Sequence, residues 1–297
     1  MAELWENKFW YNFWRSYVDL GTRMSYSRIR VEGLENVPED GAVILVPNHC
    51  TTLMDALVIL QVKKSVTVFG ARADMFKNKT AASILRWLKI VPLARLRDGA
   101  SELTKNYAVF DEISEVLAHN VPFCIFAEGT HRPQREVQPI RKGVFRIAEL
   151  ARQNLDRPLY LVPVGLDFDD FFEYMSGLTI RYGQAMDVSE FEGRDSRELT
   201  EMLRGKIQEL SGHRSDTGVA ISNPLLRVLC AVLFLPLFLL NFIISSPILL
   251  LTLLIKRKIK DRAWINTIRY GCRLPFIVFW PFHSGFYFML NFYRKLF

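Results

Sequence analysis

Apolar runs alternate with amphipathic stretches between residues 42 and 212, and this alternation predicts the architecture of most of the chain. Short, β-branched apolar runs predict buried strands, whereas longer stretches with apolar residues about every three to four positions predict helices. The predicted strands cover residues 42–47, 66–70, 122–127, 158–166 and 178–183, and the predicted helices cover residues 53–61, 80–89, 102–119, 143–154 and 197–212. Alternating elements of these lengths indicate an α/β fold with a mainly parallel sheet flanked by helices.

The N-terminal segment, residues 1–30, predicts an amphipathic helix over 4–24 with aromatic side chains along one face. These aromatic residues recur at close to one helical turn: Phe9, Trp10, Phe13, Trp14 and Tyr17. Tryptophan and tyrosine rings are stable at the headgroup level of a bilayer, so the segment is expected to lie at a membrane interface. Packing of the same stripe against the rest of the protein would explain the pattern equally well.

The composition changes abruptly near residue 224, and residues 224–297 are expected to form a hydrophobic membrane region behind a catalytic domain over 31–215. The run from Val228 to Ile255 holds no charged residue and is long enough to span a bilayer as a helix. Basic residues flank this run on both sides, and positive segments favour the cytoplasmic face. A re-entrant hairpin over 228–255 would keep both flanks on that face.

The charge and hydropathy of the chain narrow the class of partner. Half of the 297 residues are hydrophobic, the mean hydropathy is +0.10, and the formal net charge is +7 with a pI near 9.2. Such a chain is typical of a nucleic-acid binder or of a protein at an anionic membrane surface. The long apolar run favours the second class, so membrane lipids are the expected partners and nucleic acid is not. Charges at Glu3, Glu6 and Lys8 argue against a cleavable signal peptide. The cysteines fit no zinc or redox pattern, so no metal site is expected: Cys50, Cys124, Cys230 and Cys272.

A histidine and an aspartate follow the predicted strand 42–47, where α/β sheets carry their chemistry. These residues, His49 and Asp55, predict a general base oriented by a carboxylate. Six positions along one helix would hold the two side chains apart, so they meet only if His49 lies in the turn before the helix. Thr52 and Asp55 also have the spacing of a capping box, in which Asp55 would satisfy backbone N–H groups at the helix start.

Basic residues accompany three further motifs. Arg95 and Arg97 would point to one side of an extended stretch and could hold a phosphate, or they could be solvated residues of an edge strand. The strand 122–127 runs into a turn at Gly129 that can offer backbone N–H groups to an anion, with positive charge from Arg132. Lys142 immediately precedes a predicted helix start, which is another position that favours an anion.

Together these stretches resemble, in order, the four motif blocks of the glycerolipid acyltransferase family, the 1-acyl-glycerol-3-phosphate acyltransferases and their relatives. The blocks correspond to Asn48-His49 with Asp55, the stretch reaching Arg95, Phe126-Ala127-Glu128-Gly129-Thr130, and Val162-Pro163-Val164. The resemblance covers roughly residues 30–215. The chain departs from the family pattern twice. Five residues instead of four separate His49 from Asp55, which implies a longer turn, and Ala127 and His131 alter the third block.

The resemblance implies a glycerol-3-phosphate acyltransferase-like fold and an enzyme of phospholipid biosynthesis. His49 would act as general base on an acceptor hydroxyl that attacks the thioester of acyl-CoA or acyl carrier protein, and Asp55 would orient the imidazole. The foremost acceptor is 1-acyl-glycerol-3-phosphate, which gives phosphatidate, and no cofactor besides the acyl donor is implied. The residues expected to hold the substrate phosphate are Arg95, Arg97, Glu128, Gly129, Thr130, Arg132 and Lys142.

Several alternatives stay open. A lyso-aminolipid acceptor, such as the precursor of a glycine or ornithine lipid, would use the same arginines. A non-catalytic membrane scaffold with a degenerate acyltransferase fold would explain the two departures. Cys50 is the one candidate nucleophile to test, although neighbouring side chains point apart. His131 could face the ligand, but a solvated loop histidine is the expectation. For any of the lipid acceptors, we expect a membrane-associated protein whose active site faces the cytoplasm.

Overall fold

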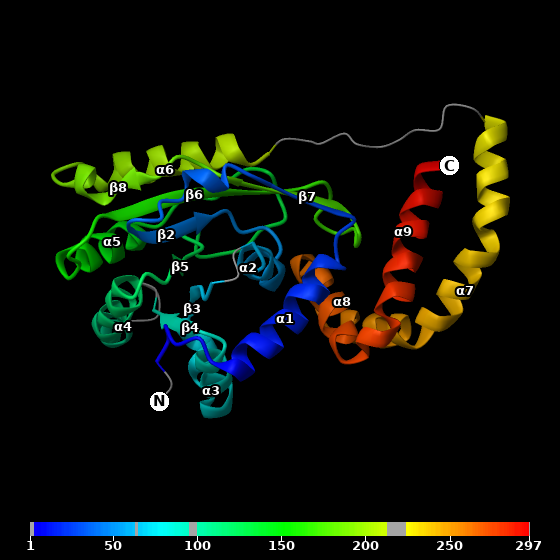
Figure 1. Ribbon diagram of the computed structural model, residues 1–297, viewed down its shortest axis with the longest axis horizontal. Coiled ribbons are helices and arrows are strands. Elements are labelled where there is room, and N and C mark those ends of the chain that lie inside the picture. The colour runs from blue at the N-terminus through cyan, green and yellow to red at the C-terminus, as the bar shows by residue number, and fades with distance from the viewer. Residues whose placement is uncertain (1–2, 63–64, 95–99, 213–223, 297) are drawn as a thin grey trace.

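The computed structural model describes residues 3–62, 65–94, 100–212 and 224–296, and within them eight strands form one sheet (Figure 1). The strand order is β1-β7-β6-β2-β5-β3-β4, and β8 pairs with β6. Most neighbours are parallel, whereas β7 and β8 pair with β6 in the antiparallel sense. The strands are β1 Arg28–Glu32, β2 Ala42–Pro47, β3 Val68–Arg72, β4 Ile90–Leu93, β5 Phe123–Cys124, β6 Leu159–Phe168, β7 Gly177–Tyr182 and β8 Met186–Asp187.

Helices flank this sheet, so the predicted α/β fold with a mainly parallel sheet is confirmed. Each strand and helix predicted between residues 42 and 212 has a counterpart. The apolar pattern misses β1, in which arginines alternate with apolar residues, β4, which has four residues, and β8, which has only two. The helices are α1 Phe9–Arg23, α2 Leu53–Leu60, α3 Lys79–Trp87, α4 Ala100–Ala118, α5 Gly143–Gln153, α6 Ser196–Leu210, α7 Pro224–Lys256, α8 Ile265–Arg273 and α9 Trp280–Leu296.

The central strand β2 is buried on both faces, as its uninterrupted apolar sequence requires. Ala42, Ile44 and Val46 point into one hydrophobic cluster, which α4, α5 and α6 cover. Val43 and Leu45 point into the other, which includes residues of α2, α8 and α9. Successive side chains of a strand alternate between faces, so one apolar segment serves both layers of the core.

The register of the parallel strands determines where the loops meet. Val46 pairs with Pro163 and Ile44 pairs with Phe123, so β2, β5 and β6 run side by side in the same direction. Their carboxyl ends therefore lie along one edge of the sheet. The turn after β2 and the loop after β5 share this edge, and these segments carry the first and third motifs.

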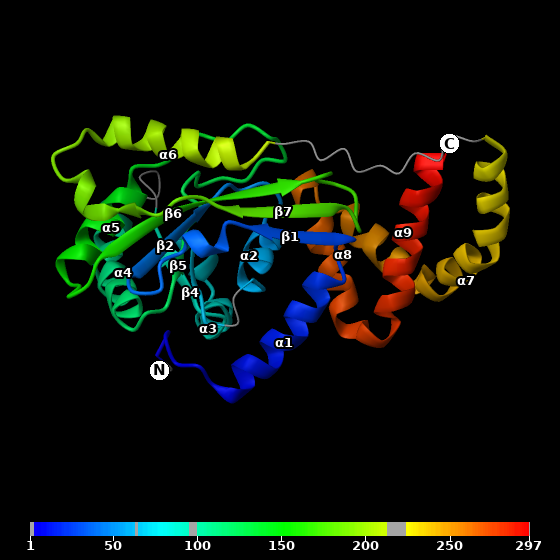
Figure 2. The ribbon, with the colours of Figure 1, turned by 45° about the horizontal axis from the view of Figure 1, so that its top comes forward.

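Helix α1 links the sheet and its helices to the C-terminal helices, and Figures 1 and 2 show it between α2 and α8. The guanidinium of Arg15 donates to the carbonyls of Leu60 (2.7 Å) and Ser65 (2.6 Å), beyond the end of α2. At Gly21 a Cβ would lie 2.2 Å from the ring of the fully buried Trp280, so only glycine permits this close approach. One face of α1 is therefore packed against the protein.

The opposite face of α1 is exposed and aromatic. Phe9, Trp10 and Phe13 are 74%, 65% and 53% exposed. Tyr11 contacts Trp87 of α3 edge-on at 6.1 Å between ring centroids, and α3 also exposes apolar side chains. Phe9, Trp10 and Phe13 of the aromatic stripe are therefore not packed against the protein, and their location at a membrane interface stays a prediction.

Helix α7 holds the uncharged run predicted from the sequence. Residues 228–256 are long and apolar enough to span a membrane by length and composition, and only 11% of their most apolar stretch is buried inside the protein. The helix contains Pro236 and Pro247 and is visibly bent in Figure 1, as expected where proline removes a backbone hydrogen bond. The re-entrant arrangement of this segment stays a prediction.

Candidate active site

The turn after β2 brings His49 and Asp55 together. The Nδ1 atom of His49 lies 2.7 Å from Oδ2 of Asp55. An ionised carboxylate can only accept, so Nδ1 carries the hydrogen and Nε2 holds the lone pair. No hydrogen-bond partner of Nε2 is found in the ranges that the structure describes, and the His49 side chain is 18% exposed. This is the arrangement that a general base requires.

Asp55 is fully buried and orients more than the imidazole. Its Oδ2 also accepts from the backbone N–H groups of Cys50 (2.7 Å) and Thr51 (2.8 Å), and its Oδ1 accepts from Oγ1 of Thr51 (2.6 Å). The aspartate therefore satisfies backbone groups ahead of α2 and holds His49 at the same time. These hydrogen bonds compensate for burial of the charge and fix the carboxylate in one position.

The additional residue between His49 and Asp55 is accommodated by an unusual backbone conformation at Thr52. Its φ of 57° and ψ of −121° match the first central position of a type II′ turn, where glycine is preferred. The longer turn inferred from the sequence is therefore present. It lets Asp55 reach back to His49 from the first turn of α2.

Glu128 holds the backbone of the same histidine. Its carboxylate accepts from the backbone N–H of His49 (2.8 Å) and of Gln138 (3.1 Å) and is buried. Burial raises the pKa of Glu128 from 4.5 to about 7, and the two hydrogen bonds offset part of this effect. The backbone N–H of Arg132 donates to the carbonyl of His49 (3.0 Å), so this loop holds both sides of the His49 peptide.

Aromatic rings surround the His49 imidazole. Phe126 stacks on it at 4.3 Å between ring centroids, and His131 approaches edge-on at 5.5 Å. The Nε2 atom of His131 lies 2.8 Å from Oδ2 of Asp261, which follows α7. The expectation of a solvated loop histidine is therefore wrong. Sequence reasoning had no signal for Asp261, because the partner is 130 positions away.

The residues predicted to bind phosphate differ in whether their side chains are exposed to solvent. Gly129 adopts a left-handed φ of 71° at the turn after β5. Thr130, Arg132 and Lys142 have exposed side chains. The carboxylate of Glu128 points to backbone N–H groups inside the protein instead of to solvent. Arg95 and Arg97 lie outside the described residues.

Cys50 is poorly suited to act as a nucleophile. Its Sγ atom is buried between Nδ2 of Asn48 (3.3 Å) and the carbonyl of Gln134 (3.6 Å). Burial, followed by the negative charge of Asp55, raises the pKa of the Cys50 thiol well above its usual range. A thiol held protonated in this way is unreactive.

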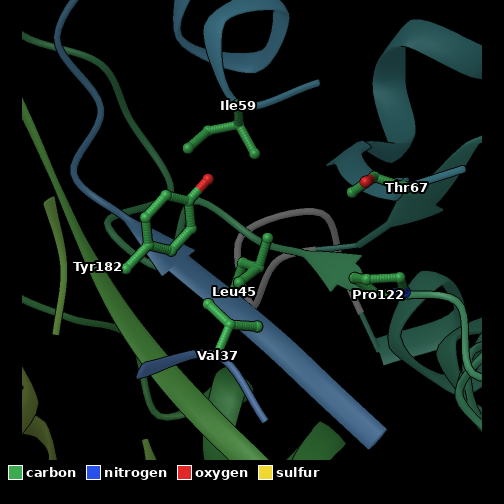
Figure 3. Close-up of a pocket in the computed structure, with 6 residues that line it drawn as sticks. All are labelled: Val37, Leu45, Ile59, Thr67, Pro122 and Tyr182. Carbon is green, nitrogen blue, oxygen red and sulfur yellow. The ribbon is translucent and has the colours of Figure 1, made fainter. Parts of the chain in front are cut away.

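A small apolar recess lies away from this site, near the amino ends of the strands (Figure 3). Its polar groups are the hydroxyls of Thr67 and Tyr182, neither of which contacts His49. The residues that line it are Val37, Leu45, Ile59, Thr67, Pro122 and Tyr182. Among the residues placed in the structure, no cluster of three or more histidine, cysteine, aspartate or glutamate side chains could hold a metal ion.

Comparison with known proteins found a matching family model and a similar solved structure. Residues 28–167 match a family model described as Acyltransferase, and no curated protein matches the chain. A solved structure, that of the 1-acyl-sn-glycerophosphate (LPA) acyltransferase PlsC from Thermotoga maritima, is 22% identical with a TM-score of 0.49 and covers 67% of this chain and 78% of that chain. The family match contains His49, Asp55 and Glu128, and residues 28–167 are therefore similar to an acyltransferase domain, in agreement with the resemblance that the motif blocks indicated.

Proposed function

We propose that the protein transfers a fatty acyl group from acyl-CoA or acyl carrier protein to the free hydroxyl of a lysophospholipid, foremost 1-acyl-glycerol-3-phosphate, which gives phosphatidate. The observation that carries this proposal is the bond between His49 Nδ1 and Asp55 (2.7 Å), which leaves Nε2 available within an acyltransferase domain. The domain match supports acyl transfer, and the imidazole supplies the base that such a transfer requires.

In the proposed reaction, Nε2 of His49 takes the proton of the acceptor hydroxyl as its oxygen attacks the thioester carbonyl. The C–S bond then breaks, an ester forms, and the imidazolium returns its proton to the departing thiolate. Asp55 stabilises the imidazolium between these steps, because its carboxylate lies 2.7 Å from Nδ1 and is shielded from solvent. Glu128 and the Arg132 backbone hold the His49 peptide in place.

The acceptor phosphate would lie at the same edge of the sheet as His49. Arg132 and Lys142 expose their side chains near the loop that follows β5, and Gly129 leaves the backbone of that loop accessible. Arg95 and Arg97, together with Thr130, complete the set that we assign to the phosphate. Guanidinium groups suit this role because they offer paired donors to phosphate oxygens.

Membrane association follows from the substrates and from two surfaces of the protein. Acyl chains of a lysophospholipid lie in the leaflet, so the site must open near it. Helix α7 is apolar enough to span a bilayer, and α1 exposes an aromatic face. Amphipathic aromatic rings are stable at the headgroup level.

The basic stretch after α7 indicates which side of the membrane holds the site. Lysines and arginines dominate residues 256–262, and such segments favour the cytoplasmic side. Asp261, within this stretch, contacts His131 beside the catalytic histidine. The active site and the basic stretch therefore lie on the same side of the membrane, and we assign both to the cytoplasm.

Acyl transfer by the purified, detergent-solubilised full-length protein tests the proposal. Labelled acyl-CoA and acyl carrier protein would be offered in turn, with lysophosphatidate and a lyso-glycine lipid as competing acceptors. His49→Ala should abolish labelling, whereas His119→Ala, which alters an exposed histidine directly after α4, should retain it. Labelling of the aminolipid alone would show that the acceptor is the lyso-aminolipid and not lysophosphatidate. No transfer from either donor by folded protein would refute the enzymatic function.

A further inference from the structure

The segment that follows α7 contacts both loops of the candidate active site. It comprises the 3-10 helix η5 (Arg262–Trp264), its capping residue Asp261, and the start of α8. Asp261 reaches His131 in the loop after β5, and Thr267 reaches Thr52 in the turn after β2. One short segment thus holds the two loops that surround His49.

Both carboxylate oxygens of Asp261 take part in the contact with His131. Oδ2 of Asp261 lies 2.8 Å from Nε2 of His131, and Oδ1 accepts from the backbone N–H of Ala263 (3.0 Å), so η5 itself fixes the carboxylate. The bond to His131 is the main reason why the pKa of Asp261 lies below its ordinary value. Trp264 packs edge-on against the same imidazole at 6.3 Å between ring centroids.

The second contact concerns the strained turn. The hydroxyls of Thr52 and Thr267 are 2.7 Å apart, so α8 holds the residue that adopts the positive φ between His49 and Asp55. A conformation of this kind persists only where the surroundings fix it. Removing the hydroxyl of Thr267 would leave that turn less constrained.

The segment is itself anchored to the catalytic domain through the loop after β6. The guanidinium of Arg262 lies over the ring of Phe172 at 4.3 Å, and the Nδ2 atom of Asn266 donates to the carbonyl of Phe171 (3.0 Å). These contacts place Asp261 and Thr267 independently of the active-site loops. The segment can therefore act as a fixed support.

We propose that the segment from Asp261 to Thr267 completes the acyl-transfer site, and that Asp261 is a positioning residue that acts through His131 to fix the wall beside His49. Asp261 and Thr267 both lie beyond the family match, which ends at residue 167. With Nε2 bonded to Asp261, Nδ1 is the remaining free nitrogen of the His131 ring among the described contacts, so the ring presents one defined polar atom. This inference rests on the proposed function.

A double-mutant cycle tests whether Asp261 acts through His131. Asp261→Asn keeps the shape of the side chain and removes its charge, and it should lower kcat/KM about tenfold in the otherwise unaltered protein. In a His131→Gln background the same change should have less than about a twofold effect, because its partner is gone. Glu192→Gln, which breaks an exposed ion pair with Arg152, is the matched control and should leave kcat/KM unchanged.

A spectroscopic readout separates positioning from general stability. In protein labelled with 15N-histidine, the His131 signals, assigned with His131→Gln, should show hydrogen on Nε2. Asp261→Ala should shift these signals and leave those of His119 unchanged. Thr267→Val should lower kcat by several-fold without altering the His131 signals, because it affects the other loop.

The possible outcomes distinguish this inference from the proposed function. If Asp261→Asn lowers kcat/KM equally with and without His131, or does not lower it, the positioning role is wrong while acyl transfer stands. Unchanged His131 signals in Asp261→Ala would contradict the contact itself. Absence of transfer by the unaltered protein, with the His131 signals as expected, would refute the proposed function, and the catalytic role of the segment with it.

Discussion

Replacing Asp55 by asparagine is the most direct test of the arrangement around His49. The amide has the same shape, and its oxygen can still accept from the N–H groups of Cys50 and Thr51, so the turn is expected to persist. What disappears is the negative charge beside the imidazole. Because Asp55 is fully buried, solvent screens this charge very little.

The size of the effect follows from the geometry. With 2.7 Å between Nδ1 and Oδ2, the centres of the two charges lie about 4 Å apart in the imidazolium state, which corresponds to about 4 kcal/mol at an effective dielectric constant of about 20. Since about 1.4 kcal/mol changes a rate tenfold, Asp55→Asn should lower kcat/KM by about a thousandfold.

Steady-state acyl transfer at saturating donor concentration measures this loss, and thermal unfolding in the same detergent checks that the variant is folded. Thr51→Val is the matched comparison, because it removes the hydroxyl that donates to Oδ1 of Asp55 (2.6 Å) and leaves the charge. We expect Thr51→Val to cost no more than about tenfold. A folded Asp55→Asn protein that retained more than a tenth of the activity would refute the electrostatic role of Asp55.

Further predictions concern a buried acid, a buried thiol and the exposed aromatic face. The pKa of Glu128, raised by burial to about 7, means that the folded protein binds a proton that the unfolded chain releases above about pH 4.5, so this group lowers stability as pH rises between these values. Glu128→Gln should therefore unfold at an increasingly higher temperature than the unaltered protein as the pH is raised from about 5 to about 8, and a constant difference would contradict this reasoning. Cys50→Ala should keep activity within about threefold, and mass spectrometry should find Cys50 unmodified by iodoacetamide in the folded protein, because its thiol is buried and protonated. Replacing Phe9, Trp10 and Phe13 by serine should weaken sedimentation with anionic vesicles severalfold and leave the unfolding temperature nearly unchanged, since these side chains are exposed. Equal binding by both proteins would remove α1 from the membrane interface.

The sequence predicts the catalytic sheet well because its strands are short apolar runs between amphipathic helices. β2 is buried throughout and β6 is buried at every position except Tyr160, and such strands leave a clear pattern. It predicts β1 poorly, because that strand is partly exposed and carries two arginines, and because its partner β7 lies far along the chain. Long-range pairing of this kind leaves no local signal.

The candidate site shows the same division between local and distant information. The pairing of His49 with Asp55 is local, so residue types and spacing are enough to propose it. The position of the Glu128 carboxylate against the His49 backbone depends on how two loops pack, which motif spacing does not encode. The hydrogen bond between His131 and Asp261 joins segments on either side of α7, and only the folded chain reveals it.

The two departures from the family pattern gain a common explanation from this packing. The longer turn places Thr52 in a conformation that costs about 1–3 kcal/mol, and Thr267 holds that residue. The altered third block introduces His131, and Asp261 holds that residue. A degenerate scaffold would be expected to lose the geometry around His49, yet Nδ1 remains 2.7 Å from Asp55. The departures therefore favour an active site that includes the segment behind α7 over one that has decayed.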